Sequence, residues 1–152
     1  MKTSSSYFLY NKNFKEKKGK AILHLTFTET QIETLKKIIE TQDHQSCIVT
    51  KSFNTVWIQG EESDTEFRIC FLGNLKLIIS RVKFQNQRQG ILSFLLEELK
   101  KICLENDVHV ICIQSVVTKK MINFCIKHHF EPDPYATFLN DGDIYGDYLL
   151  HI

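Results

Sequence analysis

One stretch in the middle of the chain, residues 75–105, constrains the fold more than any other. Its first part, LKLIISRVKF, is rich in leucine and β-branched side chains, which is typical of a mostly buried strand. Its last part, SFLLEELKKICLE, repeats apolar side chains at intervals of three and four residues, which predicts an amphipathic helix packed on a core. This apolar stripe consists of Leu92, Leu95, Leu96, Leu99, Ile102 and Cys103. The stretch therefore predicts a strand that leads through a short polar turn into a long helix.

The turn between this strand and this helix predicts an anion-binding site. The first N–H groups of a helix have no partner within the helix, and the helix dipole adds partial positive charge at the same end. Gln87, Arg88 and Gln89 stand just before the glycine of the turn, Gly90. A phosphate or a pyrophosphate is the ligand that such a strand–turn–helix unit favours.

The same turn resembles the acetyl-CoA signature of the GNAT (GCN5-related) N-acetyltransferases. That signature is written Gln/Arg-x-x-Gly-x-Gly/Ala and follows a strand that ends near a valine. Gln87 falls at its first position and Gly90 at its glycine, with Val82 in the strand before. The resemblance implies acetyl-CoA as cosubstrate, with its pyrophosphate on the backbone of residues 87–92. The residues that it assigns to cofactor binding are Val82, Lys83, Phe84, Gln87, Arg88, Gln89, Gly90, Ile91, Leu92, Ser93, Thr118 and Phe124.

A second motif, nearer the C-terminus, is also similar to the GNAT family. Family members often carry a helix that ends Phe-Tyr-x-x-x-Gly-Phe, and FCIKHHF at residues 124–130 occupies that place. Cys125 stands where the family usually has the tyrosine that protonates the departing CoA thiolate. The resemblance therefore makes Cys125 a candidate general acid, and a packed, inert thiol is the alternative. Glu66 is a candidate general base, with a solvent-facing strand residue as the alternative.

The order of the predicted elements indicates a single α/β domain. Strands are expected at residues 20–27, 47–53, 55–59, 66–72, 75–84, 108–116, 135–139 and 144–151, and helices at 29–41, 93–105 and 119–129. Strands on both sides of a crossover helix imply an α+β mixed sheet. The resemblance, over about residues 20–152, implies a GNAT-like acyl-CoA N-acyltransferase fold, with a central, mostly antiparallel sheet and helices on both faces. Residues 1–19 are expected to form a flexible basic segment.

Composition and charge narrow the classes of partner. No apolar run approaches 18 residues and the N-terminus lacks a signal-peptide core, so we expect no membrane partner and a cytoplasmic location. The 5 cysteines form no Cys-x-x-Cys pair, which predicts reduced, mostly buried thiols and no metal site. Lysines crowd the first twenty residues, at Lys2, Lys12, Lys15, Lys17, Lys18 and Lys20. A solvated segment explains them, and because no aromatic-interleaved basic patch continues into the fold, nucleic acid is not an expected partner.

The resemblance to the GNAT family implies an acetyl-CoA-dependent N-acetyltransferase. It would move an acetyl group by direct transfer to a primary amine of a small molecule, peptide or protein. The alternative is a GNAT-fold binding or regulatory module without turnover. Asp141, Asp143 and Asp147 of the last predicted hairpin would suit a cationic acceptor, or would only keep that hairpin soluble. The same final strands are a candidate interface for a homodimer.

Overall fold

A computed structural model describes residues 25–87 and 90–152 of the chain. Its elements are α3 (Glu29–Asp43), β1 (Cys47–Ser52), β2 (Thr55–Gly60), β3 (Glu66–Leu72), β4 (Lys76–Lys83), α4 (Ile91–Glu105), β5 (Val110–Val116), α5 (Lys119–Lys127), β6 (Glu131–Asn140) and β7 (Asp143–His151). The helices and strands predicted from residue 29 onward are confirmed, with small shifts at their ends. The basic segment 1–19 and residues 20–24 of the first predicted strand lie outside the described residues. Residues 25–27 form no strand.

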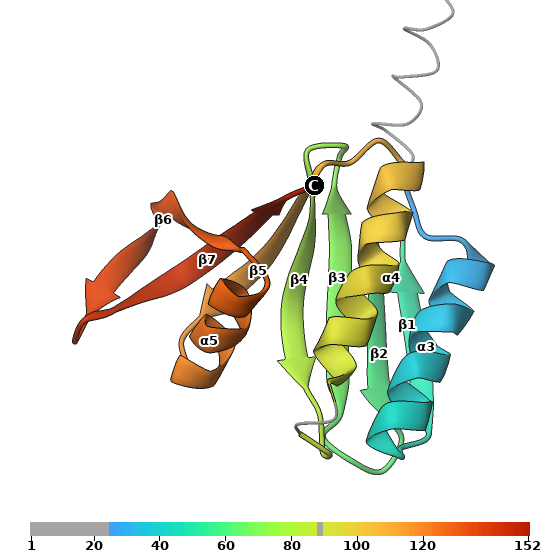
Figure 1. Cartoon of the computed structure of the whole chain (residues 1–152). Helices are drawn as coiled ribbons and strands as arrows, with labels where there is room; N and C mark the ends of the chain where they lie inside the picture. The colour runs from blue at the N-terminus through green and yellow to red at the C-terminus, as the bar shows by residue number, and fades with distance from the viewer. Residues whose placement is uncertain (1–24, 88–89) are drawn as a thin grey trace, which may run out of the picture.

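The strands form one mixed sheet of seven strands in the order β1-β2-β3-β4-β5-β7-β6 (Figure 1). All neighbouring strands run antiparallel except β4 and β5, which are parallel because α4 crosses over between them. The predicted mixed, mostly antiparallel sheet is therefore confirmed.

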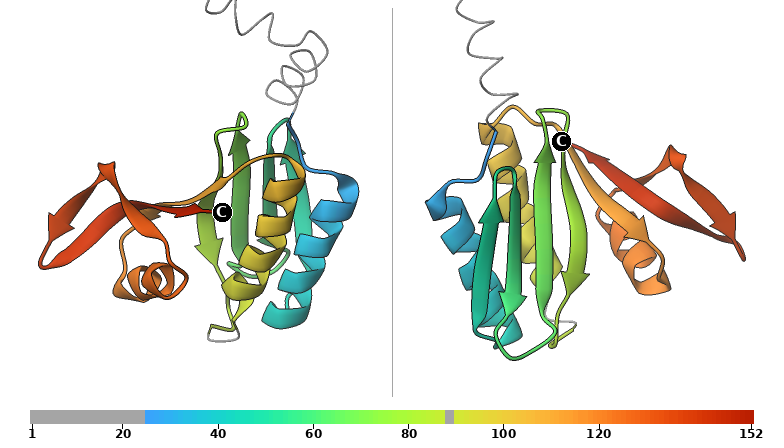
Figure 2. Two further views of the ribbon diagram at one scale, coloured as in Figure 1. Left: turned by 45° about the horizontal axis from the view of Figure 1, so that its top comes forward. Right: turned by 180° about the vertical axis from the view of Figure 1, so that it is seen from behind.

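Helices α3 and α4 lie side by side over one face of β1–β4 (Figures 1 and 2). Thr28 and Gln31 form a capping box at the start of α3, and the predicted apolar stripe of α4 is buried along its whole length. The side chains of the strands that face these helices are fully buried, among them Ile58, Phe67 and Leu77. A continuous core between sheet and helices therefore holds the first four strands together.

The face of β1–β4 opposite α3 and α4 is open, and the remaining described helix, α5, packs against β7. Seen from behind, these strands carry no helix within the described residues (Figure 2). Side chains on this face, such as Trp57 and Cys70, are half-buried, and Arg68 is exposed over the Trp57 ring. Buried and more exposed residues alternate along β3, which is typical of a strand with one face on a core and the other open to solvent.

Strands β4 and β5 separate after a short parallel pairing. The pairs are Leu77 with Ile111, Ile78 with Cys112 and Ile79 with Ile113, and beyond them the two strands share no partners. The separation begins where β4 has a bulge, because Ile69 pairs with Ile79 but Arg68 pairs with Arg81. The hairpin of β6 and β7 turns away from the rest of the sheet beyond this point (Figure 1). A gap with an unpartnered edge of β4 is thereby left inside the sheet.

The five cysteines are free thiols, as predicted, and all except the half-buried Cys70 are buried. They contribute to the core as small apolar side chains. None of the helices within residues 25–87 and 90–152 has the length and apolar composition that crossing a membrane requires.

Truncation of the core stripe of α4 tests this packing. We expect Leu99→Ala to lower the free energy of unfolding by about 2–5 kcal/mol, because Leu99 is fully buried and its removal leaves a cavity. Leu104→Ala on the same helix is the control, because Leu104 is 55% exposed, and should change it by no more than about 0.5 kcal/mol. Urea denaturation measures both, and equal losses would contradict the described orientation of α4.

Candidate functional site

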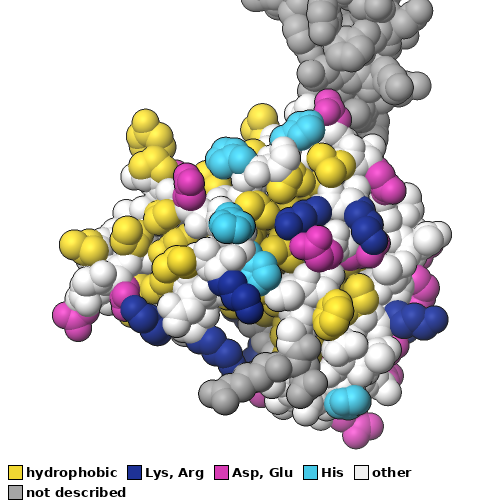
Figure 3. Space-filling view, viewed as in Figure 1, with side chains coloured by type: hydrophobic (Ala, Val, Ile, Leu, Met, Phe, Trp, Pro, Cys, Tyr) yellow, Lys and Arg dark blue, Asp and Glu magenta, His cyan; other side chains and the backbone are white. Residues whose placement is uncertain are grey.

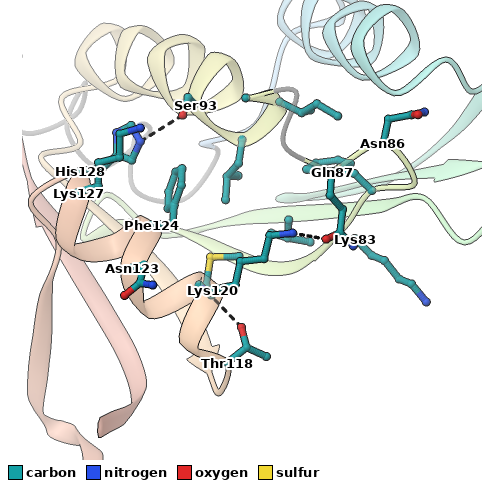
Figure 4. A pocket seen from close by; sticks show the side chains of 16 residues that line it. Lys83, Asn86, Gln87, Ser93, Thr118, Lys120, Asn123, Phe124, Lys127 and His128 are labelled. Atoms are coloured by element: carbon teal, nitrogen blue, oxygen red, sulfur yellow. Dashed lines mark hydrogen bonds between the residues drawn. The ribbon is translucent and has the colours of Figure 1, made fainter.

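A pocket of about 630 Å³ lies where β4 and β5 separate, between the end of β4, the N-terminus of α4 and helix α5 (Figure 4). Its lining residues are Val82, Lys83, Phe84, Asn86, Gln87, Gly90, Ile91, Leu92, Ser93, Thr118, Lys120, Met121, Asn123, Phe124, Lys127 and His128. The structure thus brings together every predicted cofactor-binding residue that it describes. Arg88 and Gln89, also predicted, lie outside the described residues.

The N-terminus of α4 opens into this pocket without a side-chain cap. Gly90 occupies the N-cap position with φ 71°, a left-handed conformation that glycine adopts at little cost. The first hydrogen bond of the helix runs from the N–H of Phe94 to the carbonyl of Gly90, at 3.1 Å. Within the described residues, no hydrogen bond reaches the N–H groups of Ile91, Leu92 or Ser93. The pocket therefore contains donors, at the positive end of a helix dipole, for which the described residues provide no acceptor.

Lysines give the pocket a positive charge. Among the residues that the structure describes, Lys83, Lys120 and Lys127 belong to the lining and no aspartate or glutamate does. Lys83 points away and pairs with Asp64 at 3.2 Å, whereas Lys120 reaches across the pocket and donates a hydrogen bond to Oε1 of Gln87 (Figure 4). Lysine side chains gather over α5 beside the hollow of this face (Figure 3). An anionic ligand would meet charge of opposite sign there.

Helix α5 supplies the other wall of the pocket. Thr118 is the N-cap of α5 and accepts a hydrogen bond from the N–H of Met121 at 3.2 Å. His128, at the far end of the helix, lies with its Nε2 3.1 Å from Oγ of Ser93 and its ring 4.2 Å from that of Phe124. Burial, followed by repulsion from Lys127, lowers the pKa of His128, so its imidazole is neutral at pH 7. His128 therefore joins α5 to the first turn of α4 as an uncharged hydrogen-bonding group.

The structure places neither proposed catalytic residue in the pocket. Cys125 is fully buried in the core, and this burial raises the pKa of its thiol to about 12. Such a thiol is a packed side chain and a poor proton donor to a thiolate, so the assignment as general acid is corrected. Glu66 projects elsewhere, accepting hydrogen bonds from Nε1 of Trp57 at 2.8 Å and Nε of Arg81 at 3.4 Å. Its carboxylate is held in a surface ion pair, which removes the basis for its assignment as general base.

The acids of the last hairpin do not form an open carboxylate cluster. Asp143 pairs with Lys119 at 2.9 Å, and Asp147 accepts a hydrogen bond from the N–H of Ser115 at 2.8 Å. Asp141 lies exposed in the turn. These contacts brace the hairpin against α5 and β5 and leave little of the negative charge expected for a cationic acceptor. Within residues 25–87 and 90–152, no three His, Cys, Asp or Glu side chains form a group that could ligate a metal ion.

Several lining residues were missed by the sequence analysis. Lys120, Asn123 and Lys127 recur at helical spacing on one face of α5, so the signal was present in the sequence. Asn86 gave no such signal, because its place depends on contacts with residues far away in the sequence.

Comparison with known proteins bears on the fold. No family model matches the chain, and no curated protein does. Across most of its length, and at low sequence identity, the structure resembles many GNAT-family acetyltransferases. Its described residues form a mixed seven-stranded sheet and three helices, which resemble the fold of those proteins. The expected fold class agrees with the strand order, strand directions and crossover helix described above.

Three of these structures illustrate the likeness. Ard1 from Thermoplasma volcanium is 13% identical with a TM-score of 0.48, over 84% of this chain and 95% of the other. A GNAT family acetyltransferase from Elizabethkingia anophelis with acetyl-CoA bound is 11% identical with a TM-score of 0.44, over 86% and 88%. PaiA N-acetyltransferase from Thermoplasma acidophilum in complex with coenzyme A is 14% identical with a TM-score of 0.46, over 89% and 86%. At these identities and scores the likeness concerns the fold alone.

The lowered pKa of His128 predicts a pH-dependent stability. At a pH just below about 6.5, His128 is protonated in the unfolded chain but still neutral in the folded chain, because folding lowers its pKa. The free energy of unfolding therefore falls as the pH is lowered from about 6.5 to the folded-state pKa. We expect His128→Gln to show a smaller loss of stability between about pH 7 and pH 5 than the wild type. Urea denaturation at both pH values measures it, with the exposed His151→Gln as control. An equal loss in wild type and His128→Gln would refute the assignment.

Proposed function

We propose that the chain is an acetyl-CoA-dependent N-acetyltransferase that moves the acetyl group directly to a primary amine. The observation that carries the proposal is the pocket in the gap between β4 and β5. There an uncapped helix N-terminus meets lysines, and the described lining residues include no carboxylate. Unpaired N–H groups together with cations select a phosphorylated ligand. The apolar side chains beside them select a ligand with a long, weakly polar arm.

Two parts of acetyl-CoA, the pyrophosphate and the pantetheine arm, would each have a complementary part in the pocket. The pyrophosphate would accept hydrogen bonds from the N–H groups of Ile91, Leu92 and Ser93, with Lys120 adding charge. The pantetheine arm would lie along the unpartnered edge of β4, beside Val82 and Phe84, and hydrogen-bond to it as a further strand does. The cavity of about 630 Å³ is of the size that buries a ligand of this kind.

Direct transfer requires little covalent chemistry from the protein. The nitrogen of a neutral amine attacks the thioester carbonyl carbon, a C–N bond forms, and the C–S bond breaks to release the thiolate. The nitrogen gives up one proton in this step, which passes to the thiolate directly or through water. An amine with a pKa of about 10.4 must first lose a proton, which water can accept. In this proposal, a backbone N–H of the bulged part of β4 near Arg81 would stabilise the developing oxyanion. Alignment of the two reactants in the gap would then supply most of the rate.

A second candidate function is a CoA-binding module without turnover. It is favoured by the pocket lining, which among the described residues includes no carboxylate, phenol or thiol to act as general acid or base. His128 is engaged with Ser93 at the N-terminus of α4 and lies beside the proposed phosphate site. Binding is common to both candidates, and only turnover separates them.

Calorimetric titration with CoA and acetyl-CoA tests the binding site. We expect the wild type to bind both ligands and Gly90→Glu to bind them about 100-fold more weakly, because the carboxylate would repel the pyrophosphate at the start of α4. Gly142→Glu is the matched control, since Gly142 also has a positive φ, 86°, and open space around it, but lies in the β6–β7 turn.

Absence of binding by the folded wild type would overturn both candidate functions. Equal weakening in the Gly90→Glu and Gly142→Glu variants would show that a backbone effect, and no phosphate site, is responsible. If the wild type binds, release of CoA in the presence of a panel of primary amines separates the enzyme from the module without turnover.

Replacement of Cys125 tests its exclusion from catalysis. We expect Cys125→Ala to lower the free energy of unfolding by roughly 1 kcal/mol while kcat for acetyl transfer changes by less than about threefold, because the thiol is buried away from the pocket. Cys103→Ala is the control, since Cys103 is equally buried and its thiol pKa is also raised to about 12. A tenfold or greater loss of kcat in Cys125→Ala alone would restore the thiol as proton donor.

A further inference from the structure

A buried carboxylate, that of Asp43, stands directly behind the turn that leads into the pocket. Asp43 is fully buried and is the last residue of α3. Both circumstances are unfavourable, because a buried charge loses its hydration and the C-terminal end of a helix repels an anion. Within residues 25–87 and 90–152, no lysine, arginine or histidine forms a salt bridge with it. Hydrogen bonds must therefore compensate its charge.

Most of these hydrogen bonds come from the turn that follows β4. Oδ2 of Asp43 accepts from the N–H of Gln85 at 3.0 Å, and Oδ1 accepts from the N–H of Asn86 at 2.5 Å. The side-chain amide of Asn86 donates to the main-chain carbonyl of Asp43 at 2.5 Å. The hydroxyl of Thr65, also buried, donates to Oδ2 at 2.6 Å. The residue therefore joins the end of α3 and the β2–β3 connection to the turn before α4.

We propose that Asp43 is a positioning residue for phosphate binding, an inference that rests on the proposed function. The turn from Gln85 to Gln87 has no helix or strand to hold it, yet Asn86 and Gln87 line the pocket and Gly90 follows. Anchoring two successive N–H groups to one rigid carboxylate fixes where the chain enters the pocket. Asp43 does not itself line the pocket, so it acts through these residues.

A purely structural role of Asp43 leads to a different expectation. Loss of a structural residue lowers the affinity for every ligand of the pocket by a similar factor, because the folded state is less populated. Loss of a positioning residue lowers the affinity only for ligands that contact the turn and the N-terminus of α4. CoA carries the pyrophosphate that would bind there, whereas pantetheine lacks it and would contact only the edge of β4.

The variant that tests this is Asp43→Asn in the full chain. An asparagine keeps the shape of the side chain but turns an NH₂ group toward one of the N–H or O–H donors that the carboxylate accepts. The ligands are CoA, measured by calorimetry, and pantetheine, measured by NMR titration. Ile39→Ala is the control for lost stability, because Ile39 is fully buried in the same helix and makes none of these contacts.

We expect Asp43→Asn to raise the Kd for CoA by about 10- to 100-fold while the Kd for pantetheine changes by less than about threefold. Ile39→Ala should leave both dissociation constants within about threefold of the wild type at a temperature where it is folded. If Asp43→Asn does not fold, Thr65→Val replaces it as the test variant, because it removes one hydrogen-bond donor to the same carboxylate. It should raise the Kd for CoA, but not that for pantetheine, by about threefold to tenfold.

If Asp43→Asn raises the Kd for CoA and the Kd for pantetheine by the same factor, or leaves the Kd for CoA unchanged, the inference is overturned while the proposed function stays intact. A wild type that binds no CoA would overturn the proposed function and the inference with it.

Discussion

The short parallel pairing between β4 and β5 determines where this molecule can bind a ligand. Three residue pairs hold the two strands together, and beyond Ile79 and Ile113 each strand continues with a different set of contacts. The bulge in β4 turns one strand, while Ser115, in a left-handed conformation and bonded to Asp147, turns the other. A sheet that stayed paired would have had its backbone groups satisfied and no room for a guest. The gap exists because local backbone irregularities on both strands prevent the ladder from continuing.

The parallel connection has a second consequence, since it needs a crossover helix, and the N-terminus of that helix lies at the open end of the gap. Gly90 starts α4 without a capping side chain, so the N–H groups of the first turn stay available. Lysines of α5 lie around this end, and no carboxylate belongs to the lining within residues 25–87 and 90–152. The parallel β4–β5 connection therefore brings together a groove for an extended arm and a positively charged site for phosphates.

The sequence allowed the elements and most of the pocket to be predicted, because both depend on short-range patterns. The apolar stripe of α4 and the glycine before it are local signals, and the residues assigned by the resemblance came together around the pocket as far as they are described. The misassigned side chains are those whose meaning depends on distant partners. Cys125 is buried by the packing of α5, and Glu66 is held by Trp57 and Arg81 from neighbouring strands. Periodicity cannot report such contacts.

Asp43 is a residue whose role could not be predicted, because that role also depends on distant partners. In the sequence it follows the predicted helix 29–41 among polar residues, where an aspartate is common and indicates no function. Its importance appears only when residues more than forty positions later are seen to bond to it.

The most direct test of the central claim is an NMR titration of the ¹⁵N-labelled chain with CoA. In the proposed complex, the backbone N–H groups of the first turn of α4 donate hydrogen bonds to the phosphates. The largest saturable shifts should then fall on the amides of Gly90–Ser93, followed by those of α5 that line the pocket. Saturable shifts confined to other parts of the molecule, such as β1 and β2, or no shifts at all, would contradict it.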